Sequence, residues 1–327
     1  MFELLKETHL DFMSKRKWAF IFSAAIIVPG MISMAVRGGL KLGVDFTGGV
    51  QVELQLVPTA GGTAEFPIAE VRAAVAEAGY DNRAIQKAGG GELNDFLIHV
   101  QADAAETASG SAEESGSKHI STAIKEKLQA RAPGFNVVER QVQLVGPKVG
   151  AELRLAAVQA VLLSILLILV YVAWRFEPRF GVATIIAALH DVLFILGLFS
   201  LLNKEMTLTV IAAFLTLVGY SVNDTIVVFD RIREELKLRQ KRESYEVIFN
   251  DAINKTLSRT ILTGVTTLIV LVALFFFAGE VVHDFAWVLL VGIVVGTYSS
   301  IFVAAPLVVE WNKRVEAREL AKTQRAA

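Results

Sequence analysis

Cysteine is absent from the 327 residues of this chain. Its absence excludes disulfide bonds, thiolate metal sites and a cysteine nucleophile. The chain also lacks an excess of either charge, because 32 Lys and Arg residues stand against 33 Asp and Glu residues, for a net charge of −1 at pH 7. The composition therefore gives no bulk electrostatic reason to expect nucleic-acid binding.

Hydrophobic and charged residues are both too abundant for a single kind of domain. The chain is 54% hydrophobic, whereas soluble domains average about 45–50% apolar residues. Charged residues still make up 20% of the chain, which is too many for a protein wholly embedded in a membrane. The sequence must therefore combine membrane segments with polar parts.

Six hydrophobic runs are long enough to cross a bilayer, which takes about 20 residues. The runs are Trp18–Val36, Leu155–Trp174, Phe180–Leu202, Met206–Phe229, Ile261–Ala278 and Phe285–Val309. The first run follows three basic residues, as the core of a cleaved signal peptide does. It exceeds the about 7–15 residues of such a core, however, and lacks a small-residue cleavage site.

The positions of Lys and Arg predict the orientation of these helices. Basic residues are concentrated in the segments before the first run, between the second and third, between the fourth and fifth, and after the sixth: residues 1–17, 175–179, 230–260 and 310–327. Of the two short loops on the opposite side, the one between the third and fourth runs contains only Lys204 and the one between the fifth and sixth runs contains no Lys or Arg. Cytoplasmic loops are enriched in Lys and Arg, so we expect both termini to be cytoplasmic and residues 37–154 to be extracytoplasmic.

Residues 37–154 have the length and pattern of one small α+β domain. Alternating apolar residues predict strands at 46–56, 93–100 and 135–145, with a weaker strand at 82–87. Helical patterns cover 67–79 and 120–130, and the Ala/Ser/Glu-rich stretch Ala104–Gly116 is typical of a loop. The order β-α-β-β-α-β predicts a ferredoxin-like sandwich, a fold that does not itself specify a function.

Asp224 is the first functional candidate, because an ionisable group inside a membrane helix is costly and is usually functional. It lies five residues before the end of the fourth run and follows Asn223. Asp224 and Thr225 follow Ser221 by three and four residues, so the three side chains share one helix face. This face should point into the bundle. The alternative is a carboxylate at a helix end, already solvated by cytoplasmic water.

Arg259 lies two residues before the fifth run and heads a polar stripe. Thr260, Thr263, Gly264 and Thr267 follow at helical spacing, a pattern suited to interhelical hydrogen bonds and close packing. Asp224 and Arg259 should lie at similar depth, and a carboxylate that makes and breaks such a pairing can exchange a proton. The pair therefore indicates a proton relay that needs no metal or cofactor, although Arg259 could instead be a basic anchor at the interface.

Further polar residues lie inside the other runs. Asp191, preceded by His190, is central in the third run, either as a functional carboxylate or as a structural hydrogen-bond acceptor. Small residues in the sixth run favour helix packing: Gly292, Gly296, Ser299 and Ser300. Two membrane aspartates also mark intramembrane aspartyl proteases, but here they stand in His190-Asp191 and Asn223-Asp224 and not in the Tyr-Asp and Gly-x-Gly-Asp motifs of those enzymes. No Ser/His arrangement indicates a rhomboid-like enzyme.

The loop between the fourth and fifth runs has a helical pattern of its own. Its apolar residues recur at helical spacing among polar ones: Tyr245, Ile248, Phe249, Ile253 and Leu257. This spacing predicts an amphipathic helix lying at the cytoplasmic interface before the fifth membrane helix.

Several motifs resemble those of one family. They comprise Asp45, Phe46, Thr47, Gly48 and Gly49 after the first run, Gly146 and Pro147 before the second, Gly219 to Arg231, Ser258 to Thr260, and Gly296 to Ser300. With these motifs the chain resembles SecF proteins, the protein-export membrane subunits of the bacterial Sec system, within the resistance-nodulation-division (RND) superfamily. The motif glycines, Pro147 and Asp45-Phe46-Thr47 are expected to be structural.

The resemblance implies a fold and a function. Six membrane helices would form half of a twelve-helix RND bundle, completed by SecD as a separate chain. The pair would use the proton-motive force to promote export of preproteins through SecYEG, together with YajC and YidC, in the bacterial inner membrane.

In that setting Asp224 and Arg259 would form the proton pathway, with no cofactor except the proton and no enzymatic activity. The alternatives are a small-molecule RND exporter subunit and a membrane scaffold without ion coupling. An exporter would need twelve spans and two large outer loops, whereas this chain has six spans and one such loop.

Overall fold

The computed structural model describes residues 8–59, 65–80, 85–87, 94–100, 112–239, 243–278 and 280–326. Within this part of the chain, six helical segments are long and apolar enough to cross a membrane, so the prediction of a six-helix membrane protein is confirmed. They are α1 (Arg16–Val36), α5 (Pro147–Arg175), α6 (Pro178–Leu201), α7 (Leu208–Arg239), α8 (Tyr245–Phe277), and α9 (Glu280–Ser299), which continues through the π-helix η1 (Ser300–Ala304) into α10 (Ala305–Ala326).

Most membrane helices extend beyond their hydrophobic runs. Helix α5 begins at Pro147, where a missing N–H costs nothing in the first turn, and α7 continues with polar residues to Arg239. The expected separate interface helix at 245–257 is wrong, because these residues form the first half of the continuous helix α8. Ile248, Phe249 and Ile253 are buried there, the last two in a core cluster with residues of α6, α7 and α10, so protein rather than lipid covers their apolar face.

A small α+β domain lies between α1 and α5. It contains β2 (Gly49–Pro58), α3 (Ile68–Glu77), β3 (Ile85–Lys87), β4 (Asp95–Val100), α4 (Ala112–Arg131) and β5 (Phe135–Val145). The strands form one antiparallel sheet in the order β3-β4-β2-β5. Alternate residues of β2 pack with both helices in the domain's core cluster, for example Leu54 with Val71 and Ile124.

The element order of this domain is the predicted β-α-β-β-α-β. The predicted helix at 120–130 is longer in the structure, since α4 begins at Ala112. That start replaces the last five residues of the expected loop at 104–116, while residues 104–111 lie outside the described part. Of the weak strand expected at 82–87, residues 85–87 form β3 and residues 82–84 are not among the described residues.

The Asp45–Gly49 motif joins the domain to the membrane helices. Residues 44–47 form the short helix α2 (Val44–Thr47), between β1 (Lys41–Leu42) and β2. β1 pairs in parallel with β6 (Glu205–Met206), just before α7. Gly48 and Gly49 have φ angles of 72° and 129°, which a residue with a Cβ adopts only with strain.

Asp45 is buried and ties three segments together. Its Oδ2 accepts a hydrogen bond of 2.9 Å from the backbone N–H of Leu208, the first residue of α7, while Gln143 Nε2 of β5 donates to Oδ1 at 3.2 Å. The motif therefore caps α7 and fixes its N-terminus to the domain. A bulky residue at position 150 of α5 would disturb this junction, because a Cβ on Gly150 would lie 3.0 Å from Gly48 N.

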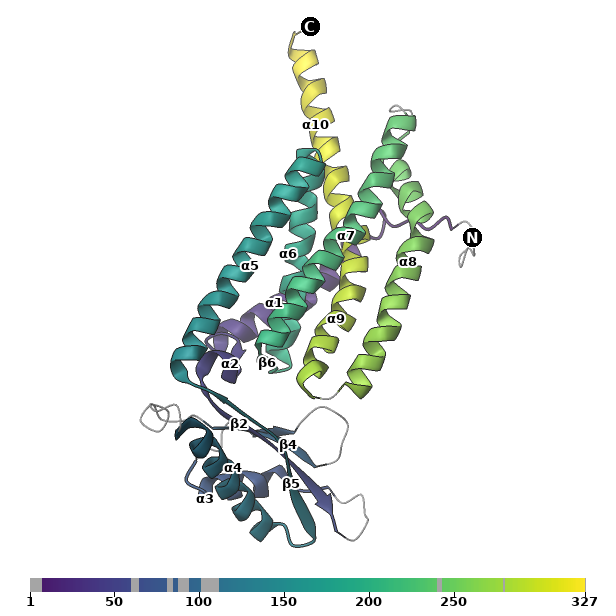
Figure 1. Ribbon diagram of the computed structural model, residues 1–327. Coiled ribbons are helices and arrows are strands. Elements are labelled where there is room, and N and C mark those ends of the chain that lie inside the picture. Colours follow the sequence, from purple (N-terminus) through teal and green to yellow (C-terminus); the bar gives the residue numbers. More distant parts are fainter. Residues whose placement is uncertain are drawn as a thin grey trace.

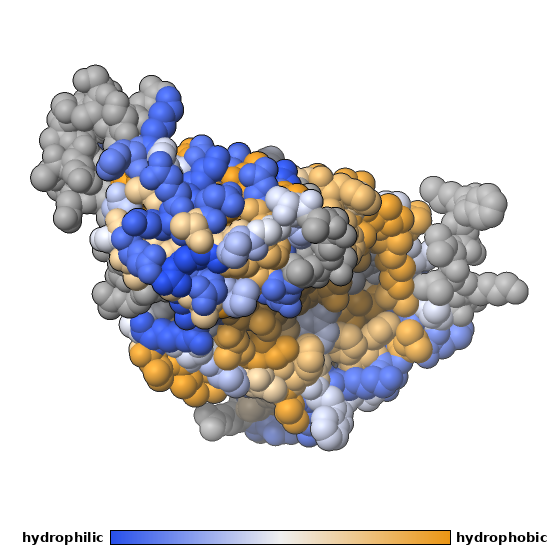
Figure 2. Space-filling model, turned by 90° about the horizontal axis from the view of Figure 1, so that it is seen from below, coloured by the Kyte–Doolittle hydropathy of each residue, from blue (hydrophilic) through white to orange (hydrophobic). Residues whose placement is uncertain are grey.

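The domain lies at one end of the helical bundle, and both chain termini lie at the other (Figure 1). We call that other end the basic end; it holds the start of α1, the α5–α6 and α7–α8 connections, and α10. Viewed from the domain side, hydrophilic residues gather over the domain while hydrophobic residues lie on the flanks of the helices (Figure 2). This division explains how one chain can be both strongly hydrophobic and rich in charge.

Candidate functional site

Helix α9 approaches α7 closely because glycines line its contact face. A Cβ on Gly292 would lie 2.5 Å from Leu217 Cδ1, and one on Gly296 would lie 3.3 Å from Ser221 Cβ. The close approach continues to the end of α9, where Ser299 and Ser300 are both buried. Helix η1 then begins at Ser300, and short π-helical segments inside α-helices often mark functional sites.

Asp224 is buried in α7, with 7% of its surface exposed. Its Oδ2 lies 2.7 Å from Ser300 Oγ, and the same serine oxygen lies 2.9 Å from the backbone carbonyl of Thr297. Thr260 of α8 is also buried beside Asp224, and its Oγ1 makes no bond of normal geometry within the described residues. The side chains found beside Asp224 as hydrogen-bonding partners among the described residues are therefore hydroxyls, which can both donate and accept.

Asp191 of α6 is fully buried next to this group. Its Oδ2 accepts hydrogen bonds from Ser221 Oγ at 2.5 Å and Ser299 Oγ at 2.8 Å, and its Oδ1 lies 2.9 Å from His190 Nδ1. Asp191 is also close enough to Asp224 for the two carboxyl groups to interact electrostatically. Adjacent serines at the end of α9 thus bind two aspartates on two different helices.

The hydrogen bonds continue from His190 to α1. His190 Nε2 lies 2.8 Å from Ser23 Oγ, which lies 3.0 Å from the hydroxyl of Tyr298; that hydroxyl lies 2.6 Å from the Ala19 carbonyl. A carbonyl only accepts, so Tyr298 donates to Ala19, Ser23 donates to Tyr298, and His190 Nε2 donates to Ser23.

Arg259 is not brought to Asp224. It is exposed on α8, and no hydrogen bond or ion pair of its side chain is found among the described residues; it lines a groove of about 540 Å³ with Asp230, Glu234 and Lys255. Successive residues on a helix are turned by about 100°. Thr260 can therefore face Asp224 while the side chain of Arg259, one residue earlier, projects from another face.

The predicted polar stripe on α8 is divided between two faces. Thr260 and Gly264 are buried, whereas Thr263 is exposed and Thr267 half-buried, and the last two bond to carbonyls of their own helix. On α7, Ser221 and Thr225 are buried with Asp224, but Asn223 and Gly219 are exposed.

Sequence reasoning assigned Ser299 and Ser300 to packing, included Tyr298 only as part of a family motif, and did not find Ser23. Their places in the site depend on which helices pack together. Within the described residues, no group of three or more His, Cys, Asp and Glu side chains could hold a metal ion.

Comparisons with known proteins agree with this architecture. Residues 123–314 match the family described as "Protein export membrane protein SecD/SecF, C-terminal", and residues 32–60 match the "SecD/SecF GG Motif". The second match contains Asp45, Gly48 and Gly49 at the junction.

Similar curated proteins cover almost the whole chain. It is 44% identical to a "Protein translocase subunit SecF" from Desulfurispirillum indicum, across 98% of this chain and 97% of that protein. It is 40% identical to one from Rhodothermus marinus, across 98% and 99%.

Solved structures give the same result. The crystal structure of SecDF from Thermus thermophilus, "a translocon-associated membrane protein", superposes with a TM-score of 0.78 at 36% identity, covering 94% of this chain and 39% of that one. A structure of SecDF in a "Super-membrane-facing form" gives a TM-score of 0.65 at 36% identity, covering 97% and 41%. The chain belongs to the SecF branch of the SecD/SecF family of protein-export membrane proteins.

Proposed function

We propose that the chain is a subunit of the protein translocase that uses the proton-motive force, by reversible protonation of Asp224, to promote preprotein export. One observation carries this proposal. The buried Asp224 carboxylate is hydrogen-bonded to the Ser300 hydroxyl, which also lies within hydrogen-bond distance of a second acceptor, the Thr297 carbonyl. The relatives named as translocase subunits and the similarity to SecDF support the cellular role. The chain acts as a coupling subunit, not an enzyme, and the proton is its only cofactor.

Ser300 lets the site accept both states of Asp224. When the carboxyl group is ionised, Ser300 donates its hydrogen to Oδ2. When the carboxyl group is protonated, it donates to Ser300, whose own hydrogen turns to the Thr297 carbonyl. Binding and release of a proton therefore require no loss of a hydrogen bond at this position.

The energy of the two states nevertheless differs greatly. A buried ionised carboxylate without a cation is costly, so the packing seen here favours a protonated Asp224. Release of the proton favours a rearrangement that brings water or a cation to the carboxylate, and Arg259 is the nearest candidate along α8. The movement reaches the domain through α7, because Asp45 fixes the start of that helix to β5.

A second six-helix chain would cover the exposed polar face of α7 and α8. Thr216, Gly219 and Asn223 of α7 and Thr263 of α8 are exposed at the depth of the membrane. Small and polar residues of this kind are typical of interfaces between membrane helices. We propose SecD as this partner, which places Arg259 at the junction of the two halves, and SecYEG, YajC and YidC as further partners in the complex.

The orientation follows from the basic end of the bundle. Four Lys- and Arg-rich segments lie there, which favours a cytoplasmic location. The α+β domain is then extracytoplasmic, on the side of the bacterial inner membrane where exported preproteins emerge.

The substitution Asp224→Asn tests the coupling, with Asp230→Asn as its matched control. Asp230 is on the same helix, but its carboxylate is 43% exposed and pairs with Arg175. We expect Asp224→Asn to abolish proton-dependent stimulation of export in proteoliposomes, with assembly with SecD intact and with Asp230→Asn active. Full stimulation by the Asp224 variant would refute the proposal. Copurification of a self-dimer in place of SecD would instead favour an exporter.

A further inference from the structure

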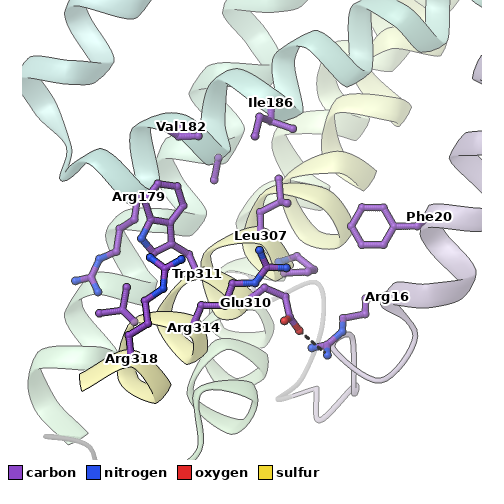
Figure 3. A pocket seen from close by; sticks show the side chains of 13 residues that line it. Arg16, Phe20, Arg179, Val182, Ile186, Leu307, Glu310, Trp311, Arg314 and Arg318 are labelled. Atoms are coloured by element: carbon purple, nitrogen blue, oxygen red, sulfur yellow. Dashed lines mark ion pairs between the residues drawn. The ribbon is translucent and has the colours of Figure 1, made fainter. Parts of the chain in front are cut away.

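A cleft at the basic end of the bundle lies apart from the carboxylate site. It has a volume of about 460 Å³ and is formed by α1, α6 and α10. Figure 3 shows the lining side chains coming from these three helices, with Arg16 of α1 reaching Glu310 of α10. The face of α7 and α8 that we assign to a partner chain does not contribute to it.

The polar wall of the cleft has an excess of positive charge. Arg16, Arg179, Arg314 and Arg318 line it, with Glu310 as the single acidic residue. Arg16 bonds to Glu310 at 2.8 Å, and Arg179 bonds to Glu177 and Asn312. Arg314 and Arg318 are exposed and form no ion pair with any described residue, so two guanidinium groups are available to an anion.

The apolar wall follows directly from the same helices. On α6, Val182 and Ile186 continue the face of Arg179 at helical spacing; on α10, Trp311 and Val315 share the face of Arg314 and Arg318. Val182, Ile186 and Trp311 are 39%, 42% and 43% exposed, although they are apolar. Each helix thus presents arginine toward the basic end and apolar surface toward the membrane interior.

We propose that this cleft binds an anionic phospholipid of the leaflet at the basic end. The phosphate group lies against Arg314 and Arg318, whose planar guanidinium groups match phosphate oxygens, while an acyl chain packs on Val182 and Ile186. Trp311 lies between the two regions, the usual place of tryptophan at a membrane interface. Basic pockets between membrane helices bind anionic headgroups for the same electrostatic reason.

Quenching of Trp311 fluorescence by brominated lipids provides the test. Trp18, Trp174 and Trp287 are replaced by Phe, and the full-length chain is placed in nanodiscs containing brominated phosphatidylglycerol or brominated phosphatidylcholine. We expect phosphatidylglycerol to be strongly preferred. The double variant Arg314→Gln/Arg318→Gln should lower that preference roughly 25-fold, about fivefold for each arginine.

The matched control is Lys17→Gln/Lys322→Gln, which removes two positive charges from the same end of the bundle but outside the cleft. It should keep the preference, and thermal melting should show all variants folded. Equal quenching by both lipids, or an unchanged preference in the arginine variant, refutes the site. Loss of preference in the lysine control would mean that surface potential alone attracts the lipid. Displacement of the brominated lipid by inorganic phosphate would identify a free anion as the ligand. Either result would overturn the proposal.

Discussion

The crossing of α1 and α6 allows one methyl group to be tested at two facing positions. A Cβ on Gly30 of α1 would lie 2.2 Å from the Cα of Gly197 and 2.8 Å from its carbonyl oxygen. A Cβ on Gly197 of α6 would lie 3.4 Å from the Cα of Gly30 and from the carbonyl oxygen of Ile26. The methyl group of Gly30→Ala would therefore clash with the backbone of α6. The methyl group of Gly197→Ala would lie close to ordinary contact distance from the backbone of α1.

The magnitudes follow from these distances. Carbon atoms pack best about 3.5–4.0 Å apart, so Gly30→Ala must separate the helices by at least ~1.3 Å. Overpacking costs about 1–3 kcal/mol, and we expect the upper end because no side-chain rotation relieves a backbone contact. Alanine regains about 1 kcal/mol over glycine in a helix. Gly30→Ala should then be about 2 kcal/mol less stable than the native chain, and Gly197→Ala neutral or up to about 1 kcal/mol more stable.

The separation would also affect the hydrogen bonds between these helices. Ser200 Oγ donates to Ser33 Oγ at 3.0 Å one turn away, and Ser23 contacts His190 at 2.8 Å on the other side of the crossing. Both bonds would exceed hydrogen-bond range after a shift of ~1.3 Å. Equilibrium unfolding in mixed micelles of detergent and dodecyl sulfate measures both variants under one set of conditions. Equal stability of the two variants, or greater damage from Gly197→Ala, would contradict the geometry.

Two further predictions concern the junction and the α+β domain. Asp45→Ala removes the acceptor for the Leu208 N–H and should cost about 1 kcal/mol of stability. Hydrogen exchange should show this loss as faster exchange of the amides in the first turn of α7. In Asp45→Asn, which keeps an acceptor, these amides should exchange much more slowly than in Asp45→Ala. In the domain, hydrogen bonding to Arg131 holds the pKa of Glu77 below its ordinary value of 4.5, so this pair stabilises the fold at neutral pH and its contribution disappears as the pH falls below that value. Arg131→Gln should therefore lower the melting temperature of the chain at neutral pH and have less effect in acid, whereas a pH-independent effect, or an equal effect of Arg72→Gln, would argue against the pairing.

Hydropathy was sufficient to predict the membrane helices but not where they end. A run of apolar residues marks the part of a helix that lies in lipid, and the hydrogen-bonded backbone can continue past it. Helix α8 illustrates this, since its first half carries polar residues yet packs Phe249 and Ile253 into the bundle core. The amphipathic pattern was recognised correctly. The pattern alone, however, cannot show whether lipid or protein packs against the apolar face of the helix.

Helix periodicity placed Ser221 and Thr225 with Asp224 because all three belong to one helix. The relation between Asp224 and Arg259 is different, since it depends on how α8 is rotated about its own axis. That rotation is set by Thr260 and Gly264, which are buried and so leave Arg259 on another face. The depth of a residue can be predicted from the sequence, but its direction depends on the packing of its neighbours.

The contacts of Ser299 and Ser300, where α9 passes into η1, are the part of the site that depends most on how the helices pack together. Two adjacent residues of a helix point about 100° apart, so Ser299 reaches Asp191 on α6 while Ser300 reaches Asp224 on α7. Each serine also lies within hydrogen-bond distance of a carbonyl of its own helical segment, Gly296 for Ser299 and Thr297 for Ser300. A rotation of α9 must therefore change the surroundings of both carboxyl groups together. The surroundings of the two carboxyl groups are consequently linked by the position of one helix segment, even though the hydrogen bonds described here do not join the two aspartates directly.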